Sequence, residues 1–280
     1  MRLLPTAPRL LTGLLLTLSL QVAPLRAQPP YQLNTGREVG LLGLGAATGV
    51  TSLVLEQKLD PLTATEVNSL NRADINAFDR RAAYQYSTTA SHLSDATLLG
   101  NVAVTGLLTL GTPVMRREVK TVGVMFLETL LLANGVQRSI KNLTERTRPY
   151  VYNPNAPLDT KLDRSSRQSF FSGHTTNAFA TAVFTGEVFR HYFPASRFRG
   201  LVWGGSLGLA TATAVLRYEA GMHYPTDLIA GAAFGSLVGW GIPKLHEVTG
   251  KTALGRRLDL QPWSNGQSSG IYARMLVFSR

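Results

Sequence analysis

Residues 217–243 read RYEAGMHYPTDLIAGAAFGSLVGWGIP, a polar segment followed by an apolar one. Pro225-Thr226 marks the start of a helix, and the apolar run over residues 228–243 continues that helix. His223 and Asp227 stand four residues apart at this start, so the carboxylate can accept a proton from one imidazole nitrogen and leave the other free for nucleophilic attack. The stretch therefore predicts a core helix with a reactive group at its N-terminus.

Further apolar stretches precede this one, at residues 39–55, 96–115, 121–137 and 200–216. Residues 175–189 also read as a helix. Together these six segments predict an all-α fold.

Two other regions differ in composition from the helices. The polar span 56–95, which contains Asp74, Asp79, Arg80 and Arg81, is expected to carry short helices over the mouth of the site, with a plain surface loop as the alternative. At the C-terminus, residues 258–263 and 271–278 are rich in strand-forming residues and flank Ser264-Asn265-Gly266, which predicts a small β-hairpin. The expected organisation is an N-terminal helix and polar connection over 28–95, a catalytic core over 96–250 and a hairpin over 251–280.

Cations and a glycine motif accompany the His/Asp pair. Lys141 and Arg148 would lie two turns apart on one face if residues 120–148 are helical, with Pro149 ending that helix. Ser172-Gly173-His174 precedes a helix, so the amides of Gly173 and His174 would lie at its positive end, where an anion is favoured. Arg217 adds a guanidinium fork suited to phosphate oxygens.

Each of these motifs alone has an ordinary structural explanation. A Lys/Arg pair is usually solvated, a Ser-Gly-His is usually a loop, and an i, i+4 His/Asp pair is more often a structural hydrogen bond than a catalytic dyad. Their occurrence together in one chain favours a site that holds and attacks a tetrahedral oxyanion. The sequence therefore predicts that the protein handles phosphate.

The spacing of these motifs resembles the tripartite signature of the type 2 phosphatidic acid phosphatase and vanadium haloperoxidase superfamily, over about residues 96–245. The resemblance implies an α-helical bundle, here a six-helix bundle, with the three motifs at one end. It also implies His223 as the nucleophile, Asp227 as its orienting partner and His174 as the acid that protonates the leaving oxygen. Phosphate-binding roles are implied for Lys141, Arg148, Ser172, Gly173 and Arg217. Phe171 and Leu216 depart from the family, which usually has proline and serine at these positions.

The composition narrows the function classes. The chain of 280 residues carries a formal net charge of +11, but its basic residues are scattered, which disfavours nucleic-acid binding and suits an anionic lipid surface or a phosphorylated substrate. The absence of cysteine excludes disulfides and cysteine metal sites. No clustered metal motif stands out, so we expect no metal and no cofactor in the reaction.

The N-terminus suggests export. Arg2 and Arg9 precede an apolar run over residues 10–23 and a small-residue cleavage point at Ala27, the layout of a secretory signal over residues 1–27. A short anchoring helix is the competing interpretation.

The basic loops around residues 116–120 and 197–199 favour a membrane-embedded enzyme whose site faces the periplasm. A cleaved signal followed by six full crossings would instead place Lys141 on the cytoplasmic side. An exported soluble bundle is therefore the alternative, with membrane embedding slightly preferred.

The leading hypothesis is a metal-independent phosphatase that hydrolyses a lipid phosphate or diphosphate through a phosphohistidine on His223. A vanadate-dependent haloperoxidase, with vanadate held by His223, is the chemical alternative. A non-catalytic envelope protein with a phosphate-binding pocket is the third possibility.

Overall fold

The computed structural model describes residues 29–248, 258–264 and 269–275. A helical unit lies within Pro29–Thr252, and a second unit contains the C-terminal hairpin. The expected signal over residues 1–27 lies outside the described residues.

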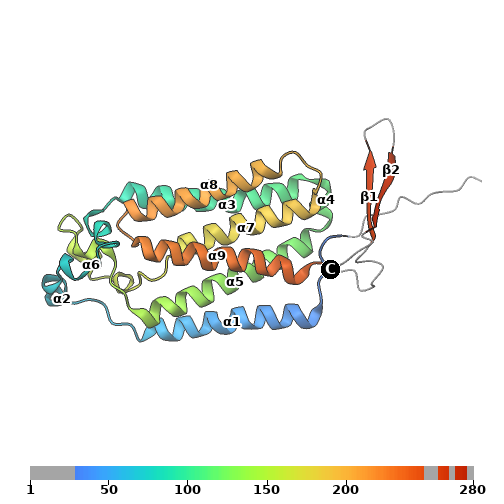
Figure 1. The fold of residues 1–280 in the computed structure, drawn as a ribbon. Coiled ribbons are helices and arrows are strands. Elements are labelled where there is room, and N and C mark those ends of the chain that lie inside the picture. The colour runs from blue at the N-terminus through green and yellow to red at the C-terminus, as the bar shows by residue number, and fades with distance from the viewer. Residues whose placement is uncertain (1–28, 249–257, 265–268, 276–280) are drawn as a thin grey trace, which may run out of the picture. The chain divides into compact units, whose positions relative to one another are not determined.

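Six long helices build the helical unit (Figure 1). They are α1 (Thr35–Gln57), α3 (Thr88–Gly111), α5 (Val119–Thr144), α7 (Gly173–Tyr192), α8 (Arg199–Glu219) and α9 (Pro225–His246). The all-α prediction is confirmed, and each of the six expected segments corresponds to one of these helices. The described residues also form the short helices α2 (Ala64–Ser69), α4 (Pro113–Arg117) and α6 (Leu158–Lys161), which makes nine helices rather than six.

The connection between α1 and α3 holds α2 and two 3₁₀ turns, at Arg72–Asp74 and Arg80–Tyr84, in agreement with the short helices expected there. Helix α3 begins at Thr88, where the side chain of Ser87 accepts a hydrogen bond from the backbone N–H of Ala90. It therefore runs through the expected boundary between residues 95 and 96. The N-terminal part and the catalytic core belong to one compact unit.

Helix α5 is shorter than expected. It ends at Thr144, because Glu145 adopts a left-handed conformation with φ of 45° and its N–H bonds the Lys141 carbonyl. Arg148 lies beyond this end in an extended conformation, followed by a 3₁₀ turn at Pro149–Tyr152. The prediction that Lys141 and Arg148 share one helix face is therefore wrong.

Helix α7 is central to the bundle and packs against α3, α5, α8 and α9. Its contact with α9 is close because Gly231, Gly235 and Gly239 form one face of α9. A Cβ at Gly235 would lie 2.2 Å from the carbonyl oxygen of Thr176, and one at Gly239 would lie 2.3 Å from that of Ala180. Glycines at this spacing let two helix backbones approach. The N-termini of both helices lie at one end of the bundle, where the Ser172 N–H donates to the Asp227 carbonyl.

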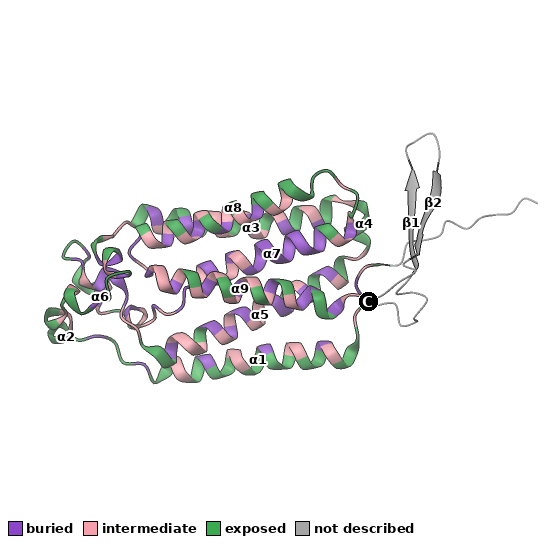
Figure 2. Ribbon diagram, in the orientation of Figure 1, coloured by how far each residue is buried: buried purple, intermediate pink, exposed green. Residues whose placement is uncertain are grey.

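The outer helices carry many exposed residues (Figure 2), a number of which are large and apolar, whereas several of their buried residues are small or polar. On α3 the exposed residues include Leu99 and Leu107, at 69% and 72%, whereas Asn101 and Thr105 are buried. Four helical segments are long and apolar enough to cross a membrane: α1, α3, α9, and α5 with the turn that follows it. This distribution is that of a membrane-embedded protein, because lipid, unlike water, favours many large apolar side chains along the outside of long apolar helices.

The hairpin of the second unit pairs β1 (Leu258–Ser264) with β2 (Ser269–Met275) in antiparallel register, Ser264 opposite Ser269. The predicted hairpin is thus confirmed. The expected turn at Asn265-Gly266 and the end of the expected second strand at Phe278 lie outside the described residues.

Candidate active site

A cavity of about 290 Å³ opens at the end of the bundle where α5 and α8 end and α7 begins. Five of the eight predicted site residues line it, namely Lys141, Arg148, Gly173, His174 and Arg217. Its wall continues along α5 and α7 through polar side chains that the sequence did not single out, among them Asn134, Gln137 and Asn177. Each of the three motifs therefore contributes at least one residue to one cavity, whereas Ser172, His223 and Asp227 are not among its lining residues.

Three cations line the cavity: Arg148 and Arg217 are buried, and Lys141 is half-buried. Among the described residues, no carboxylate lies in ion-pair contact with Lys141, Arg148 or Arg217. Arg217 donates to the hydroxyls of Ser91 and Ser94, at 3.2 and 3.3 Å, and burial together with Arg148 lowers its pKa to about 10. Since buried charges in proteins are normally paired, this cluster is arranged for an anion.

His223 has one ring nitrogen engaged and one free. Its Nδ1 lies 2.8 Å from the Ser169 carbonyl oxygen, which can only accept, so Nδ1 carries the proton. The Nε2 atom is buried and has no hydrogen-bond partner among the described residues. Burial, with the cations Lys141 and Arg148, lowers the pKa of His223 well below its usual range. The imidazole is therefore neutral, with its free lone pair on Nε2.

Asp227 is placed differently from the expectation. Its nearest oxygen is 3.6 Å from His223 Nδ1, beyond hydrogen-bond distance, and the direct acceptor is the backbone of Ser169. The carboxylate accepts instead from the Ser169 hydroxyl, the Arg146 guanidinium and the Tyr224 N–H. Asp227 thus acts on His223 through its charge and through Ser169, whose carbonyl holds the imidazole and whose hydroxyl holds the carboxylate.

Arg146 and Asp79 belong to the same network and were not predicted as site residues. Arg146 bridges Asp227 and Asp79, the latter at 2.8 Å. Asp79 is fully buried and accepts from the backbone N–H and hydroxyl of Thr226, at 3.1 and 2.7 Å. The polar connection therefore caps the first turn of α9 and fixes the position of Asp227, an effect beyond covering the mouth of the site.

His174 lies on the cavity wall and is partly exposed. Its Nε2 lies 2.7 Å from Oδ1 of Asp95, a residue of α3 that sequence reasoning also missed. Burial and Arg217 lower the pKa of His174 to about 4, against the opposing effect of Asp95. An anion bound beside Arg217 would offset this effect and favour the protonated imidazole.

Ser172 does not line the cavity. Its buried hydroxyl caps α7, accepting from the Thr175 N–H at 3.4 Å and contacting the Thr175 hydroxyl at 3.0 Å. The Ser172 side chain thus begins the helix that carries Gly173 and His174, and its predicted contact with phosphate stays a prediction.

Comparisons with known proteins match this part of the chain. Residues 123–250 match the family model described as the PAP2 superfamily. A Lipid A 4'-phosphatase of Porphyromonas gingivalis is 30% identical over 110 residues, which are 39% of this chain and 41% of that protein. The match thus spans about two fifths of that relative.

A crystal structure from Bacillus subtilis, titled as the first transmembrane PAP2 type phosphatidylglycerolphosphate phosphatase, aligns with 72% of this chain and 94% of its own. The TM-score is 0.47 and the sequence identity 18%.

Proposed function

We propose that this chain, whose residues 123–250 match the PAP2 superfamily, is a member of that family and a phosphatase that removes a phosphate group from a membrane lipid. The observation that carries the proposal is Nε2 of His223, which has no hydrogen-bond partner among the described residues and lies in the field of three cations that form no ion pair there. Such a site suits a phosphoryl group, whose equatorial oxygens gain charge stabilisation as the nucleophile attacks. The lipid-phosphatase relative and the apolar outer surface of the bundle support a lipid as the substrate.

The reaction proceeds in two steps. Nε2 of His223 attacks the phosphorus atom, the P–N bond forms, and the bond to the leaving oxygen breaks while His174 donates a proton to that oxygen. A water molecule then attacks phosphorus, gives its proton to the neutral His174, and releases phosphate from Nε2. Lys141, Arg148, Arg217 and the N–H of Gly173 hold the phosphate oxygens throughout.

The proposal is tested with purified protein and ³²P-labelled phosphatidic acid or lipid A. His223→Ala should abolish turnover, and wild-type enzyme quenched during turnover should carry acid-labile label that the variant lacks. His92→Ala, a change at an exposed histidine of α3, is the matched control and should be fully active. Normal turnover in His223→Ala would refute the nucleophile assignment.

We also propose that the hydrolysis itself needs no metal ion. Initial rates should be unchanged in EDTA, whereas orthovanadate should inhibit competitively because it adopts the five-coordinate geometry of the transition state. A haloperoxidase would instead oxidise bromide with hydrogen peroxide once loaded with vanadate. Loss of hydrolysis in EDTA and its recovery with Mg²⁺ would overturn the metal-free mechanism.

The orientation proposed for the site is toward the periplasm. Arg116, Arg117 and Arg197 belong to connections at the end of the bundle opposite the cavity, which suits a cytoplasmic location for that end (Figure 1). Tyr31 pairs with Glu247 at this same end, so α1 begins there. A chain cleaved after Ala27 would begin outside, which is incompatible with six full crossings in this orientation.

The absence of native cysteine allows a direct test of orientation. Two single-cysteine variants report the two sides of the membrane: Leu158→Cys at the cavity end of the bundle and Ala195→Cys at the opposite end. Both positions are exposed. In intact spheroplasts an impermeant maleimide should label only the first. The reverse labelling pattern would place the site in the cytoplasm.

A further inference from the structure

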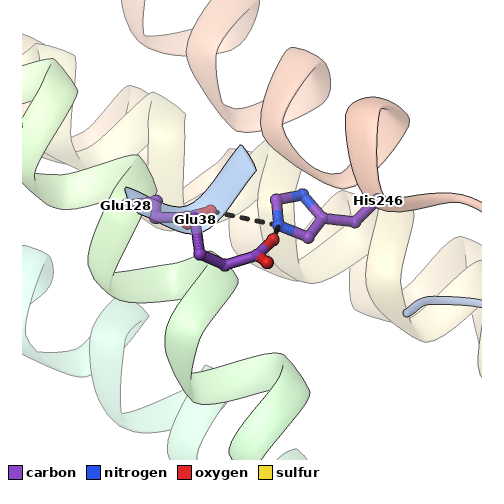
Figure 3. Close-up of side chains that lie close together, drawn as sticks. All are labelled: Glu38, Glu128 and His246. Atoms are coloured by element: carbon purple, nitrogen blue, oxygen red, sulfur yellow. Dashed lines mark ion pairs between the residues drawn. The ribbon is translucent and has the colours of Figure 1, made fainter. Parts of the chain in front are cut away.

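Glu38 of α1, Glu128 of α5 and His246 of α9 meet inside the bundle at the end opposite the cavity (Figure 3). One ligand atom from each lies within 4.8 Å of the others, and all three residues are buried, Glu128 and His246 completely. We call this group the triad. His223 precedes α9 and His246 ends it, so the triad is about 30 Å from the proposed nucleophile.

The triad directs three electron-rich atoms at one point. His246 Nδ1 lies 2.8 Å from the Ile242 carbonyl oxygen, so this nitrogen carries the proton and Nε2 carries the lone pair. Nε2 lies 2.9 Å from Oε1 of Glu38 and 3.2 Å from Oε2 of Glu128. Among the described residues no partner of Nε2 meets the angular criteria of a hydrogen bond, although the contact with Glu38 is within hydrogen-bond distance. A lone pair facing two carboxylate oxygens at these distances is repulsive unless a cation lies between them.

With a neutral imidazole, the triad and Arg37 together leave one negative charge unbalanced among the described residues. Arg37 pairs with Glu38 at 2.9 Å, but Glu128 forms no ion pair with a lysine or arginine. Both oxygens of Glu128, and Oε2 of Glu38, are buried without a hydrogen-bond partner among the described residues. A proton on Nε2 could form a hydrogen bond to only one carboxylate and would leave the remaining buried oxygens without a donor. A divalent cation would serve His246 and both carboxylates together.

We propose that the triad binds a divalent transition-metal ion, Zn²⁺ in the first instance, with water completing the coordination. Metal–ligand distances of about 2.0–2.2 Å place neighbouring ligand atoms roughly 3.0–3.5 Å apart; the 3.2 Å contact of Nε2 with Glu128 lies in this range, and the 2.9 Å contact with Glu38 lies just below it. A nitrogen with two carboxylates suits Zn²⁺ better than Mg²⁺ or Ca²⁺. The Nδ1 contact to a backbone carbonyl is the usual outer support of a metal-binding histidine.

The ion would have a structural effect. It would join the first turn of α1, the middle of α5 and the last turn of α9. Without the ion, the packing of these helices brings two carboxylates close together. Because the triad is remote from the cavity, removal of the metal should lower thermal stability and leave the rate of hydrolysis unchanged well below the melting temperature.

The test uses the full-length protein, purified in detergent without a polyhistidine tag and treated with EDTA. One equivalent of Zn²⁺ should rebind, measured by mass spectrometry of the metal after gel filtration, and should raise the melting temperature. Glu128→Gln and His246→Asn should each weaken this binding at least about 10-fold. The control variants Glu219→Gln and His92→Asn change exposed residues and should bind normally.

Two further measurements distinguish this site from others. His174→Ala should keep its equivalent of metal, because the proposed site is not in the cavity. X-ray absorption of the Co²⁺-loaded wild type should show a single imidazole with oxygen ligands, which keeps the proposal testable even if the triad variants fail to fold. Wild-type protein that binds no Zn²⁺, triad variants that bind it normally, or a Co²⁺ site without imidazole would overturn the proposal and leave a protonated His246 as the counter-charge.

Discussion

The close contact between α7 and α9 predicts the effect of adding one methyl group. In Gly235→Ala the new Cβ would lie 2.2 Å from the carbonyl oxygen of Thr176, whereas such a contact normally needs about 3.3 Å. The obstacle is backbone rather than a flexible side chain, so the two helices must separate by roughly 1 Å. The N-terminus of α7 carries His174, and α9 follows directly after His223. Their separation therefore changes the distance between the proposed acid and the proposed nucleophile.

Gly235→Ala is expected to lower both the folding stability and the rate of hydrolysis. Overpacking costs about 1–3 kcal/mol of folding free energy, and the higher helix propensity of alanine returns up to about 1 kcal/mol, so a net loss of roughly 1–2 kcal/mol is expected. A displacement near 1 Å at reacting groups costs on the order of 10²-fold in rate. Gly235→Ala should thus lower kcat/KM on phosphatidic acid far more than its loss of stability would suggest.

Gly241→Ala is the matched control. It lies on the same helix, but an added Cβ would meet nothing within 4 Å, so this variant should be as stable as the wild type or slightly more so, with full activity. Stability is measured by SDS titration in mixed micelles, and activity at a temperature where both variants are folded. If Gly235→Ala behaves like Gly241→Ala in both assays, the close contact does not position the site.

Three further outcomes are expected. His174→Ala should lose on the order of 10²-fold or more on an alkyl lipid phosphate and clearly less on p-nitrophenyl phosphate, whose leaving group needs no proton; equal losses would contradict the acid role. Asp227→Asn should lose on the order of 10²-fold in kcat, less than the about 10⁴-fold typical of a directly bonded carboxylate, because the Ser169 carbonyl still holds the imidazole. Burial and Arg217 lower the pKa of His174 to about 4, and a bound anion should raise it, so sulfate should bind together with a proton. The inhibition constant of sulfate should therefore fall as the pH is lowered from 7 to 5. An unchanged pH dependence in His174→Asn would assign that proton to another group.

The helices and the reactive motifs were accessible to sequence reasoning because both depend on local features. Apolar runs, Pro225 at a helix start and Ser172 before another helix are properties of neighbouring residues, and the six long helices follow them. The motif spacings likewise named the three cations and both histidines, which the fold brings to one end. The length of α5 was overestimated because the left-handed Glu145 is a residue without a strong turn signature.

The partners of those residues were decided by the tertiary structure alone. The Ser169 carbonyl that holds His223 is 54 positions away in the chain, Asp95 is 79 from His174, and Asp79 is 67 from Arg146. Glu38, Glu128 and His246 come from three separate helices, and no spacing between them marks a shared site. The sequence by itself determines which segments become helices and which side chains carry reactive groups, since those follow from local conformation and composition. Which carboxylate meets which cation or imidazole depends on how whole helices pack, and here close glycine contacts and the capping of α9 by Asp79 set that packing.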